Sequence, residues 1–151
     1  MKKIKYLVSV TACAILFAGS AALALAKPLF SLTVTPVITN PAHQFFPDIS
    51  GRWMVFNDNR SGLSEVYLYD FKNGTEQPIM NTALPHGNYP RIDGDTVVWV
   101  DYRSGSGRVY AYDIRTKEGK FLSENLGWGP AVDKDRVVWM DNHVGDIGNE
   151  I

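Results

Sequence analysis

The stretch PDISGRWMVFNDNRSGLSEVYLYDF, Pro47–Phe71, decides the fold because it returns 43 residues later as PRIDGDTVVWVDYRSGSGRVYAYDI, Pro90–Ile114. A third copy, PAVDKDRVVWMDNHVGDIGNEI, starts 40 residues further on and runs from Pro130 to Ile151. A period of about 40–45 residues is typical of a four-stranded β-propeller blade, a unit that cannot bury its own apolar faces. The repeat therefore predicts an all-β propeller whose successive copies pack against one another.

Each copy divides into strands at its turns. Runs rich in apolar and aromatic residues are interrupted by NRSG, KNGT and RSG, which are turn-forming sequences. The predicted strands are Arg52–Asn57, Glu65–Phe71, Gln77–Met80, Thr96–Asp101 and Arg108–Ile114. No segment has an amphipathic helical pattern of useful length.

The runs Val97–Val100 and Val137–Met140 are apolar on both faces of the strand. A strand with one wet face alternates apolar and polar residues, whereas the blades of a propeller are covered by a neighbour on each side. An antiparallel sandwich also produces such runs. The fixed period and the repeated turns favour the propeller, with blades at about 43–85, 86–126 and 127–151, the last incomplete.

The first 26 residues have the features of a secretory signal peptide. Three early lysines precede an apolar run from Tyr6 to Leu25, and a small-x-small sequence ends at Ala26. We expect cleavage between Ala26 and Lys27 and an extracellular, cell-surface or periplasmic location. An uncleaved anchor is the main alternative, since the run is nearly long enough to span a bilayer, and lipidation at Cys13 is a minor one.

Cleavage would leave 125 residues without cysteine, because Cys13 is the only one in the chain. The mature protein would have neither disulfides nor thiol chemistry. It would keep 12 basic and 16 acidic residues, a net charge of about −4. This charge argues against nucleic acid and anionic membrane surfaces as partners. We expect membrane attachment only through the leader or through an anchor outside this sequence.

Residues 27–42 lie between the leader and the repeats. Within them, Thr33–Ile38 is strand-like and lies where a preceding blade would place its outermost strand. Propellers commonly close when an N-terminal strand completes the last blade. This segment is therefore a candidate closing strand, and we expect its partner strands to lie outside the sequence.

The repeats resemble the TolB-type, WD-like β-propeller repeats of secreted and cell-surface proteins. Blades of that family carry a Pro-Asp near the inner strand, an aromatic-x-Asp, an Arg/Asn-x-Gly hairpin and a Tyr-x-Tyr-Asp strand. The matching segments are Pro47-Asp48, Phe56–Asp58, Arg60–Gly62, Tyr67–Asp70, Trp99–Asp101, Arg103–Gly105 and Tyr110–Asp113. The resemblance covers the chain from about Thr33 onward, and it implies either a binding protein or an accessory module of an enzyme.

The third copy departs from the others at Asn142–Gly145, where they have Arg-Ser-Gly. Six or so blades of this period need roughly 250 residues, and this sequence supplies about two and a half blades. We expect either a fragment of a longer propeller or a chain that associates with other chains through open blade edges. Fragmentation is favoured, because an exposed apolar edge invites aggregation.

Aspartates recur at one position of the blade, as Asp58, Asp101 and Asp141. A ring of carboxylates suggests a metal, but an Asp ahead of a hairpin usually accepts N–H groups of the turn, so we interpret these residues as structural. We assign the same structural role to the hairpin glycines Gly62 and Gly105.

Four side chains are candidates for facing a ligand. Arg60 and Arg103 either pair with the aspartates or lie exposed on one rim. Trp128, between two glycines in a predicted inter-blade loop, either stacks on a sugar or partner side chain or plugs the blade junction, and Tyr89 fits either role. In addition, Asn59 and Asn73 begin N-x-[ST] sequons on predicted hairpins and are candidate glycosylation sites.

The sequence contains no nucleophile elbow, phosphate-binding glycine loop or metal-ligand histidine spacing. We therefore expect no catalytic, cofactor-binding or metal-binding residues. The favoured function is a non-catalytic exported or cell-surface propeller that binds proteins or glycans through loops at one end. The alternatives are the scaffold fragment of a propeller enzyme, of the polysaccharide lyase or peptidase type, and a structural surface-layer repeat.

Overall fold

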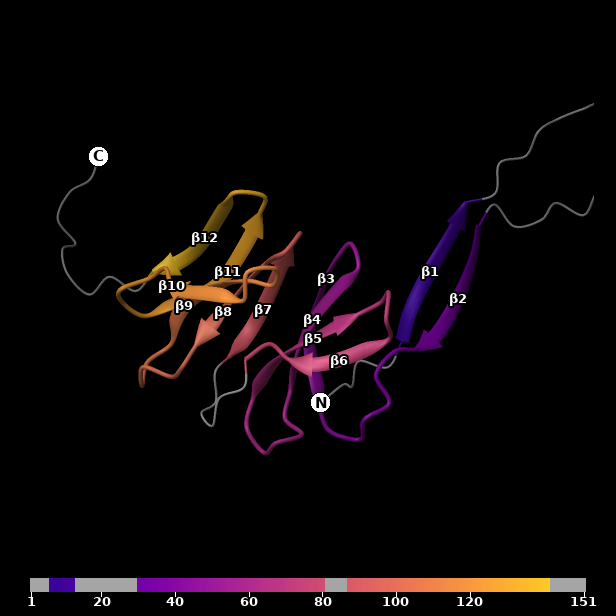
Figure 1. The fold of residues 1–151 in the computed structure, drawn as a ribbon, viewed down its shortest axis with the longest axis horizontal. Coiled ribbons are helices and arrows are strands. Elements are labelled where there is room, and N and C mark those ends of the chain that lie inside the picture. Colours follow the sequence, from indigo (N-terminus) through magenta and orange to yellow (C-terminus); the bar gives the residue numbers. More distant parts are fainter. Residues whose placement is uncertain (1–5, 13–29, 81–86, 142–151) are drawn as a thin grey trace, which may run out of the picture. The chain divides into compact units, whose positions relative to one another are not determined.

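The computed structural model describes residues 6–12, 30–80 and 87–141. Every regular element in these ranges is a β-strand (Figure 1), and no helix there is long and apolar enough to cross a membrane. Contacts divide the chain into two units, one formed mainly by residues 42–151 and the other by residues 4–41.

The larger unit consists of three antiparallel sheets. The first blade contains β3 (Gln44–Ser50), β4 (Trp53–Asp58), β5 (Glu65–Asp70) and β6 (Thr75–Pro78) in that spatial order. The second contains β7 (Asn88–Asp93), β8 (Thr96–Asp101), β9 (Arg108–Asp113) and β10 (Glu118–Phe121) in the same order. The third has the pair β11 (Gly127–Asp133) and β12 (Arg136–Asp141).

The outer strand of the first blade begins earlier than expected. We predicted Gln77–Met80, and β6 spans Thr75–Pro78. The reason is the tightness of the turn before it, where Gly74 has a φ of 65° and donates its N–H to the Asp70 carbonyl at 2.8 Å. Because the turn occupies only the four residues between them, Thr75 is already paired with Asp70 and the outer strand begins there.

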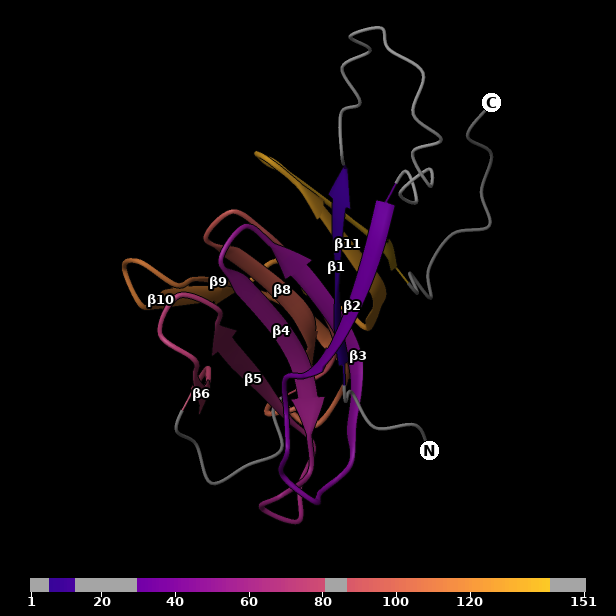
Figure 2. The ribbon, with the colours of Figure 1, turned by 90° about the vertical axis from the view of Figure 1, so that its right-hand side faces the viewer.

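The main core lies between the first and second blades. Its buried side chains come from neighbouring sheets: Val55, Val66, Leu68, Ile79, Ile92, Val97, Trp99 and Tyr110. Figure 2 shows β4 in front of β8, as expected of sheets stacked face to face. The two-sided apolar strands are therefore the middle strands of a stack, and this arrangement is that of a propeller.

Successive blades are joined at the β3–β4 and β7–β8 hairpins by a repeated hydrogen bond. Ser50 Oγ in the first blade accepts the N–H of Gly94 in the second at 2.9 Å. Asp93, which follows Ser50 by 43 residues, accepts the N–H of Lys134 in the third blade at 2.6 Å. The repeat in sequence thus corresponds to a repeated contact between blades.

The outward face of the third blade is open. Val138 and Met140 are 64% and 66% exposed, whereas Val98 and Val100 at the same positions of the second blade are fully buried. A hollow of about 360 Å³ borders the neighbouring face of the second blade near Thr96, Ala111 and Lys120. Val98 and Val100 are covered because β11 of the next blade packs against β8 and β9, whereas no described residue covers the corresponding face of the third blade.

The smaller unit contains a two-stranded antiparallel sheet. In it, β1 (Tyr6–Ala12) pairs over its whole length with β2 (Phe30–Pro36). The first part of the candidate closing strand lies in β2, and its partner in this structure is β1, within the first 26 residues. Closure of a propeller by this segment stays a prediction. The backbone N–H and C=O groups along an edge of β2 need hydrogen-bond partners. In the chain that keeps its leader, β1 provides them. The cleavage residues Ala26 and Lys27 lie outside the described residues.

Candidate functional site

The inner strands β3, β7 and β11 begin at the same end of the propeller as the β4–β5 and β8–β9 hairpins. We refer to this end as the linker end. Each inner strand has a β-bulge there, between Phe45 and Asp48, between Asn88 and Arg91, and between Trp128 and Ala131. A bulge re-aims side chains and is common beside binding sites.

The bulges place a residue in the left-handed region at the same point of every blade. Phe46, Tyr89 and Gly129 have φ values of 53°, 59° and 56°. Only the third copy uses glycine, the residue that adopts this conformation without strain. Two bulky aromatic residues therefore occupy positions where the backbone would favour a smaller one.

Aromatic side chains at or beside the bulges form two pairs that bridge neighbouring blades. Phe46 packs on Tyr89 with ring centroids 4.5 Å apart, and Tyr102 meets Trp128 edge-on at 6.3 Å. Phe46 and Trp128 remain 40% and 37% exposed, and the two tyrosines are half-buried. Trp128 lies on strand β11 and not in the predicted loop, because the chain enters the strand before the bulge.

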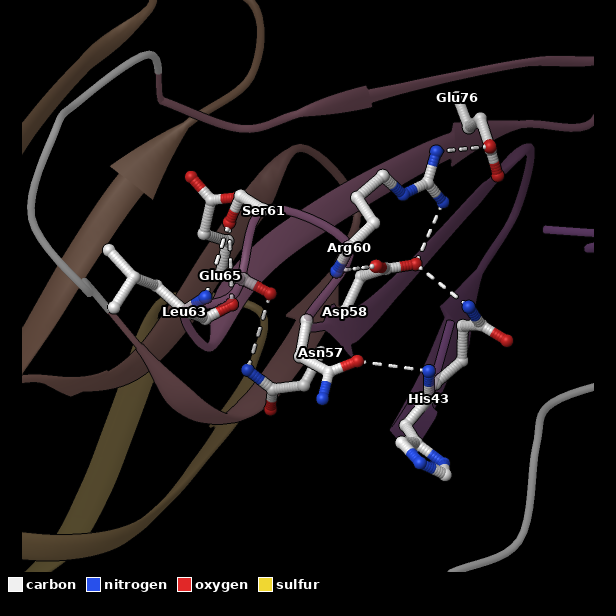
Figure 3. Close-up of polar contacts among 10 residues, drawn as sticks. His43, Asn57, Asp58, Arg60, Ser61, Leu63, Glu65 and Glu76 are labelled. Carbon is white, nitrogen blue, oxygen red and sulfur yellow. Dashed lines mark hydrogen bonds and ion pairs between the residues drawn. The ribbon is translucent and has the colours of Figure 1, made fainter. Parts of the chain in front are cut away.

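Asp58 is the centre of a polar network at the linker end (Figure 3). Its Oδ1 accepts the backbone N–H of Arg60 at 2.7 Å, and its Oδ2 accepts the Arg60 guanidinium at 2.7 Å and Gln44 Nε2 at 3.0 Å. The same guanidinium donates to Glu76 at 2.6 Å and lies 4.4 Å from the Tyr67 ring centroid. Asp58 has no exposed surface.

The second blade repeats the network with one exchange of donor. Asp101, fully buried, accepts the backbone N–H of Arg103 at 2.9 Å and its Nε at 2.9 and 3.0 Å. Trp99 Nε1 donates to Asp101 at 2.9 Å, in the place of Gln44 in the first blade. The guanidinium of Arg103 lies 4.6 Å from the Tyr110 ring centroid.

The two arginines therefore have the local role and are not free on the rim. The side chains of Arg60 and Arg103 are 23% and 20% exposed, and each is paired within its own blade. The hairpin glycines Gly62 and Gly105 follow with φ of 90° and 89°, where a Cβ would be strained.

Burial alone would raise the pKa of Asp58, but hydrogen bonds from Arg60 and Gln44 outweigh it, so the pKa is lowered from its usual value. The pKa of Arg60 is raised by the bond to Asp58. Asp58 and Arg60 therefore carry opposite charges at neutral pH and form an ion pair within the hairpin. It has the features of a structural clamp for the hairpin and not of an acid–base centre.

Asp141 ends β12 and is exposed, and the hairpin expected after it lies outside the described residues. Within residues 30–80 and 87–141, no three His, Cys, Asp or Glu side chains lie close enough to hold a metal ion. Asp58, Asp101 and Asp141 belong to three different sheets. The structure does not bring them together.

A second polar cluster ties the first blade to the start of β7. The buried Asn57 donates its Nδ2 to the Gly87 carbonyl at 2.6 Å and accepts the Tyr89 N–H at 3.2 Å. Ser64 Oγ donates to the Gly87 carbonyl at 3.0 Å and lies 2.9 Å from Asn88 Oδ1. This cluster fixes the strained backbone at Tyr89, and sequence reasoning did not identify it, because its members lie 23 to 32 residues apart.

Both sequon asparagines already make local hydrogen bonds. Asn59 Oδ1 accepts the His43 N–H at 2.9 Å, and Asn73 Nδ2 donates to Asp70 at 2.7 Å. A glycan would be attached through Nδ2, the atom that Asn73 uses as a donor and that Asn59 does not use in its bond to His43. Glycosylation at Asn59 and Asn73 stays a prediction.

The sequence matches no protein-family model and no curated protein at a significant level. The fold, in contrast, is similar to solved structures. Against TolB from Acinetobacter baumannii the TM-score is 0.57 at 16% identity, over 78% of this chain and 36% of that one. Against a TolB structure from Agrobacterium tumefaciens it is 0.57 at 17% identity, over 78% and 48%. The tricorn protease gives 0.50 at 14% identity, over 60% and 8%.

The chain spans less than half the length of the TolB structures that it matches. At these identities the likeness concerns the fold and not the activity. Two complete four-stranded blades, the start of a third and the agreement with two TolB structures lead to one conclusion. The chain has a TolB-like β-propeller fold, incomplete within the described residues.

Proposed function

We propose that this protein is an exported β-propeller module that acts by binding, without catalysis, and that its binding surface is the linker end. The exposed aromatic pairs carried by the inner-strand bulges are the observation that supports this proposal. Exported binding proteins commonly use Tyr and Trp, which combine a large apolar surface with a polar tip. The partner is a protein or a glycan of the cell envelope.

Export is supported by the lysine-rich start, the apolar run and the small-residue site at Ala26. The ionisable groups at the linker end favour binding over catalysis. The Asp58–Arg60 and Asp101–Arg103 pairs are satisfied within their own hairpins, so neither is poised to move a proton. Accessory domains of enzymes share this fold, and a propeller enzyme whose catalytic part lies elsewhere remains the alternative.

Binding of the fluorescently labelled protein to envelopes of the cell that produces it tests the proposal. The whole chain is expressed with its leader, so that the cell processes it. We expect saturable binding that falls at least tenfold in Trp128→Ala. The matched control is Ile49→Ala, which removes a 55% exposed apolar side chain from the opposite end of β3. Equal loss in both variants, or no saturable binding, would refute a binding surface at the linker end.

A further inference from the structure

We propose that the aromatic surface at the linker end, formed by Phe46, Tyr89, Tyr102 and Trp128, is a binding site for an uncharged glycan chain. This inference rests on the proposed function and names its ligand class. Four observations lead to it: the strain at two of the rings, the position of the pairs, the charge of the surface and its area.

The first observation is the backbone strain at Phe46 and Tyr89, two positions whose equivalent in the third blade is a glycine. Phe46 and Tyr89 lie at φ of 53° and 59°, where Gly129 serves in the third blade. The fold therefore tolerates glycine at this position, and an aromatic residue there is retained at a cost in backbone strain. Strain of this kind is characteristic of positions that serve a ligand.

The pairs lie at successive blade junctions. The Phe46–Tyr89 pair joins the first blade to the second, and the Tyr102–Trp128 pair joins the second to the third. The two pairs are also near each other, because Asn88, the neighbour of Tyr89 in sequence, makes a side-chain hydrogen bond with Tyr102. The rings thus form a row across three blades, which suits an extended chain of repeating units better than a single small molecule.

The charged groups nearest the row disfavour an acidic ligand, since the exposed Asp141 pairs with Gly127 on the neighbouring strand, next to Trp128. Asp58 and Asp101 are fully buried, and their charges are balanced by Arg60 and Arg103. Hydrogen-bonding groups remain on the row in the tyrosine hydroxyls and the indole N–H. Sugar rings have apolar faces that stack on aromatic rings and hydroxyl groups that bond to such tips, so a neutral glycan matches this surface.

The area of the row distinguishes a glycan from a protein partner. An aromatic side chain offers about 150–250 Å² when fully exposed, and none of these four is more than 40% exposed. Together they present at most about 400 Å², whereas a stable protein interface covers about 800 Å² on each partner. The row is large enough for a few sugar rings, whereas a protein partner would also have to cover the surface around it.

The test measures binding of three neutral hexasaccharides, cellohexaose, mannohexaose and N-acetylchitohexaose, by calorimetry and tryptophan fluorescence. Hexagalacturonate serves as the charged comparison. We expect at least one neutral hexasaccharide to bind and to shift the tryptophan emission, a shift that Trp128→Ala should abolish, and hexagalacturonate to bind at least tenfold more weakly. Failure of all three neutral ligands, or a preference for the charged one, would overturn the inference.

Two variants separate a ligand role from a structural one. Tyr89→Gly removes a ring and relieves its backbone, so affinity should fall about tenfold while the unfolding midpoint falls by no more than about 4 °C. Trp128→Ala should weaken binding to the same degree, and Ile49→Ala should leave it unchanged. If Tyr89→Gly unfolds the protein, or if all three variants bind equally, the row has no ligand role.

The envelope assay keeps this inference distinct from the proposed function. Periodate oxidation of the envelopes destroys glycans, and protease treatment removes proteins. Binding that depends on Trp128 but is lost only after protease treatment would leave the proposed function standing and overturn the glycan site. Loss after periodate alone supports both.

Discussion

Gly87 lies against the indole of Trp99, so closely that a Cβ at residue 87 would be 2.6 Å from Trp99 Cδ1. The first blade has Gln44 and Phe56 at the same two positions. There Gln44 Nε2 bonds to Asp58, and in the second blade Trp99 Nε1 bonds to Asp101. The first two blades therefore supply the same kind of hydrogen bond to the buried aspartate from two different positions, residue 44 in the first blade and residue 99 in the second.

This exchange predicts strong coupling between residues 87 and 99. Gly87→Gln alone should destabilise the protein by about 3 kcal/mol, because the core cannot accommodate the side chain beside Trp99. Trp99→Phe alone should also destabilise it, because Asp101 loses a donor. The double variant places Gln and Phe where the first blade has Gln44 and Phe56. It relieves the contact with the indole but not the one with Val66 Cγ2, also 2.6 Å from a Cβ at residue 87, so its loss should be smaller than the sum by at least about 1 kcal/mol.

Urea denaturation of the four proteins in this cycle measures the coupling. Additive losses would show that the two blades do not use interchangeable donors. A glycine–tryptophan pair also occurs in the third blade, where a Cβ on Gly127 would be 3.2 Å from Trp139 Cδ1.

The Asp58 network makes stability depend on pH in a defined direction. The pKa of Asp58 in the folded protein is lowered, while an unfolded Asp titrates near about 3.9. Its stabilising contribution is therefore fully present above about pH 4 and is lost as the pH falls through the lower folded pKa.

Asp58→Asn should cost about 3 kcal/mol at pH 7, because it leaves Arg60 without its buried partner. The difference from the unmodified protein should shrink as the pH falls below about 4. Urea unfolding at a series of pH values measures this. The control is Asp135→Asn, in an exposed pair with Arg136, which should have little effect at any pH. A difference for Asp58→Asn that is constant with pH would contradict the assignment.

Asn57 is predicted to hold the second blade in place. Asn57→Ala would leave the Gly87 carbonyl with one donor fewer and the buried side of the Tyr89 N–H unpaired, at a cost of about 2 kcal/mol. Hydrogen exchange should accelerate at the Tyr89 amide in particular. Ser104→Ala, which removes an exposed hydroxyl bonded to the Ser106 carbonyl, is the control and should change stability by less than about 0.5 kcal/mol. Equal effects in both variants would show that the cluster does not carry the blade contact.

The middle strands could be predicted from the sequence because their turns and two-sided apolar runs are local signals. Thr96–Asp101 is found within the predicted bounds. The inner strands β3, β7 and β11 were not predicted, since each contains a proline at its bulge, and proline within a run argues against a strand. The prolines are Pro47, Pro90 and Pro130.

The candidate site was harder to predict than the fold. Spacing alone could not decide whether Arg60 pairs with Asp58 or reaches the rim, because both are compatible with a hairpin. Trp128 and Tyr89 were identified one by one, but their partners Tyr102 and Phe46 come from neighbouring blades. Such a contact depends on how the bulges aim side chains, and no local pattern encodes it.

Processing of the leader can be checked by mass. The exported protein should begin at Lys27, and Ala26→Leu should slow cleavage, because signal peptidase sites require small residues. Cleavage also removes β1, the partner of β2. The amides of Phe30 to Thr35 that pair with β1 should then exchange faster in the processed chain than in the precursor. A secreted protein of unprocessed mass would indicate an anchor instead of a signal peptide.

The open face of the third blade predicts self-association. Val138 and Met140 are exposed where Val98 and Val100 are fully buried, and β12 has a single strand partner among the described residues. Exposed apolar faces beside a sheet edge favour association. The double variant Val138→Ser/Met140→Ser should therefore lower the mass measured by light scattering. Because both side chains are already exposed, its stability should change by less than about 0.5 kcal/mol for each substitution.

The matched control is Val98→Ser, which should destabilise the chain by burying an unpaired hydroxyl and should not reduce association. Circular dichroism on the same samples shows whether the β structure and its cooperative melting persist. A monomeric unmodified chain that melts cooperatively would contradict the prediction, because the open face would then need no cover. Association that survives the double variant would instead place the contact on another edge.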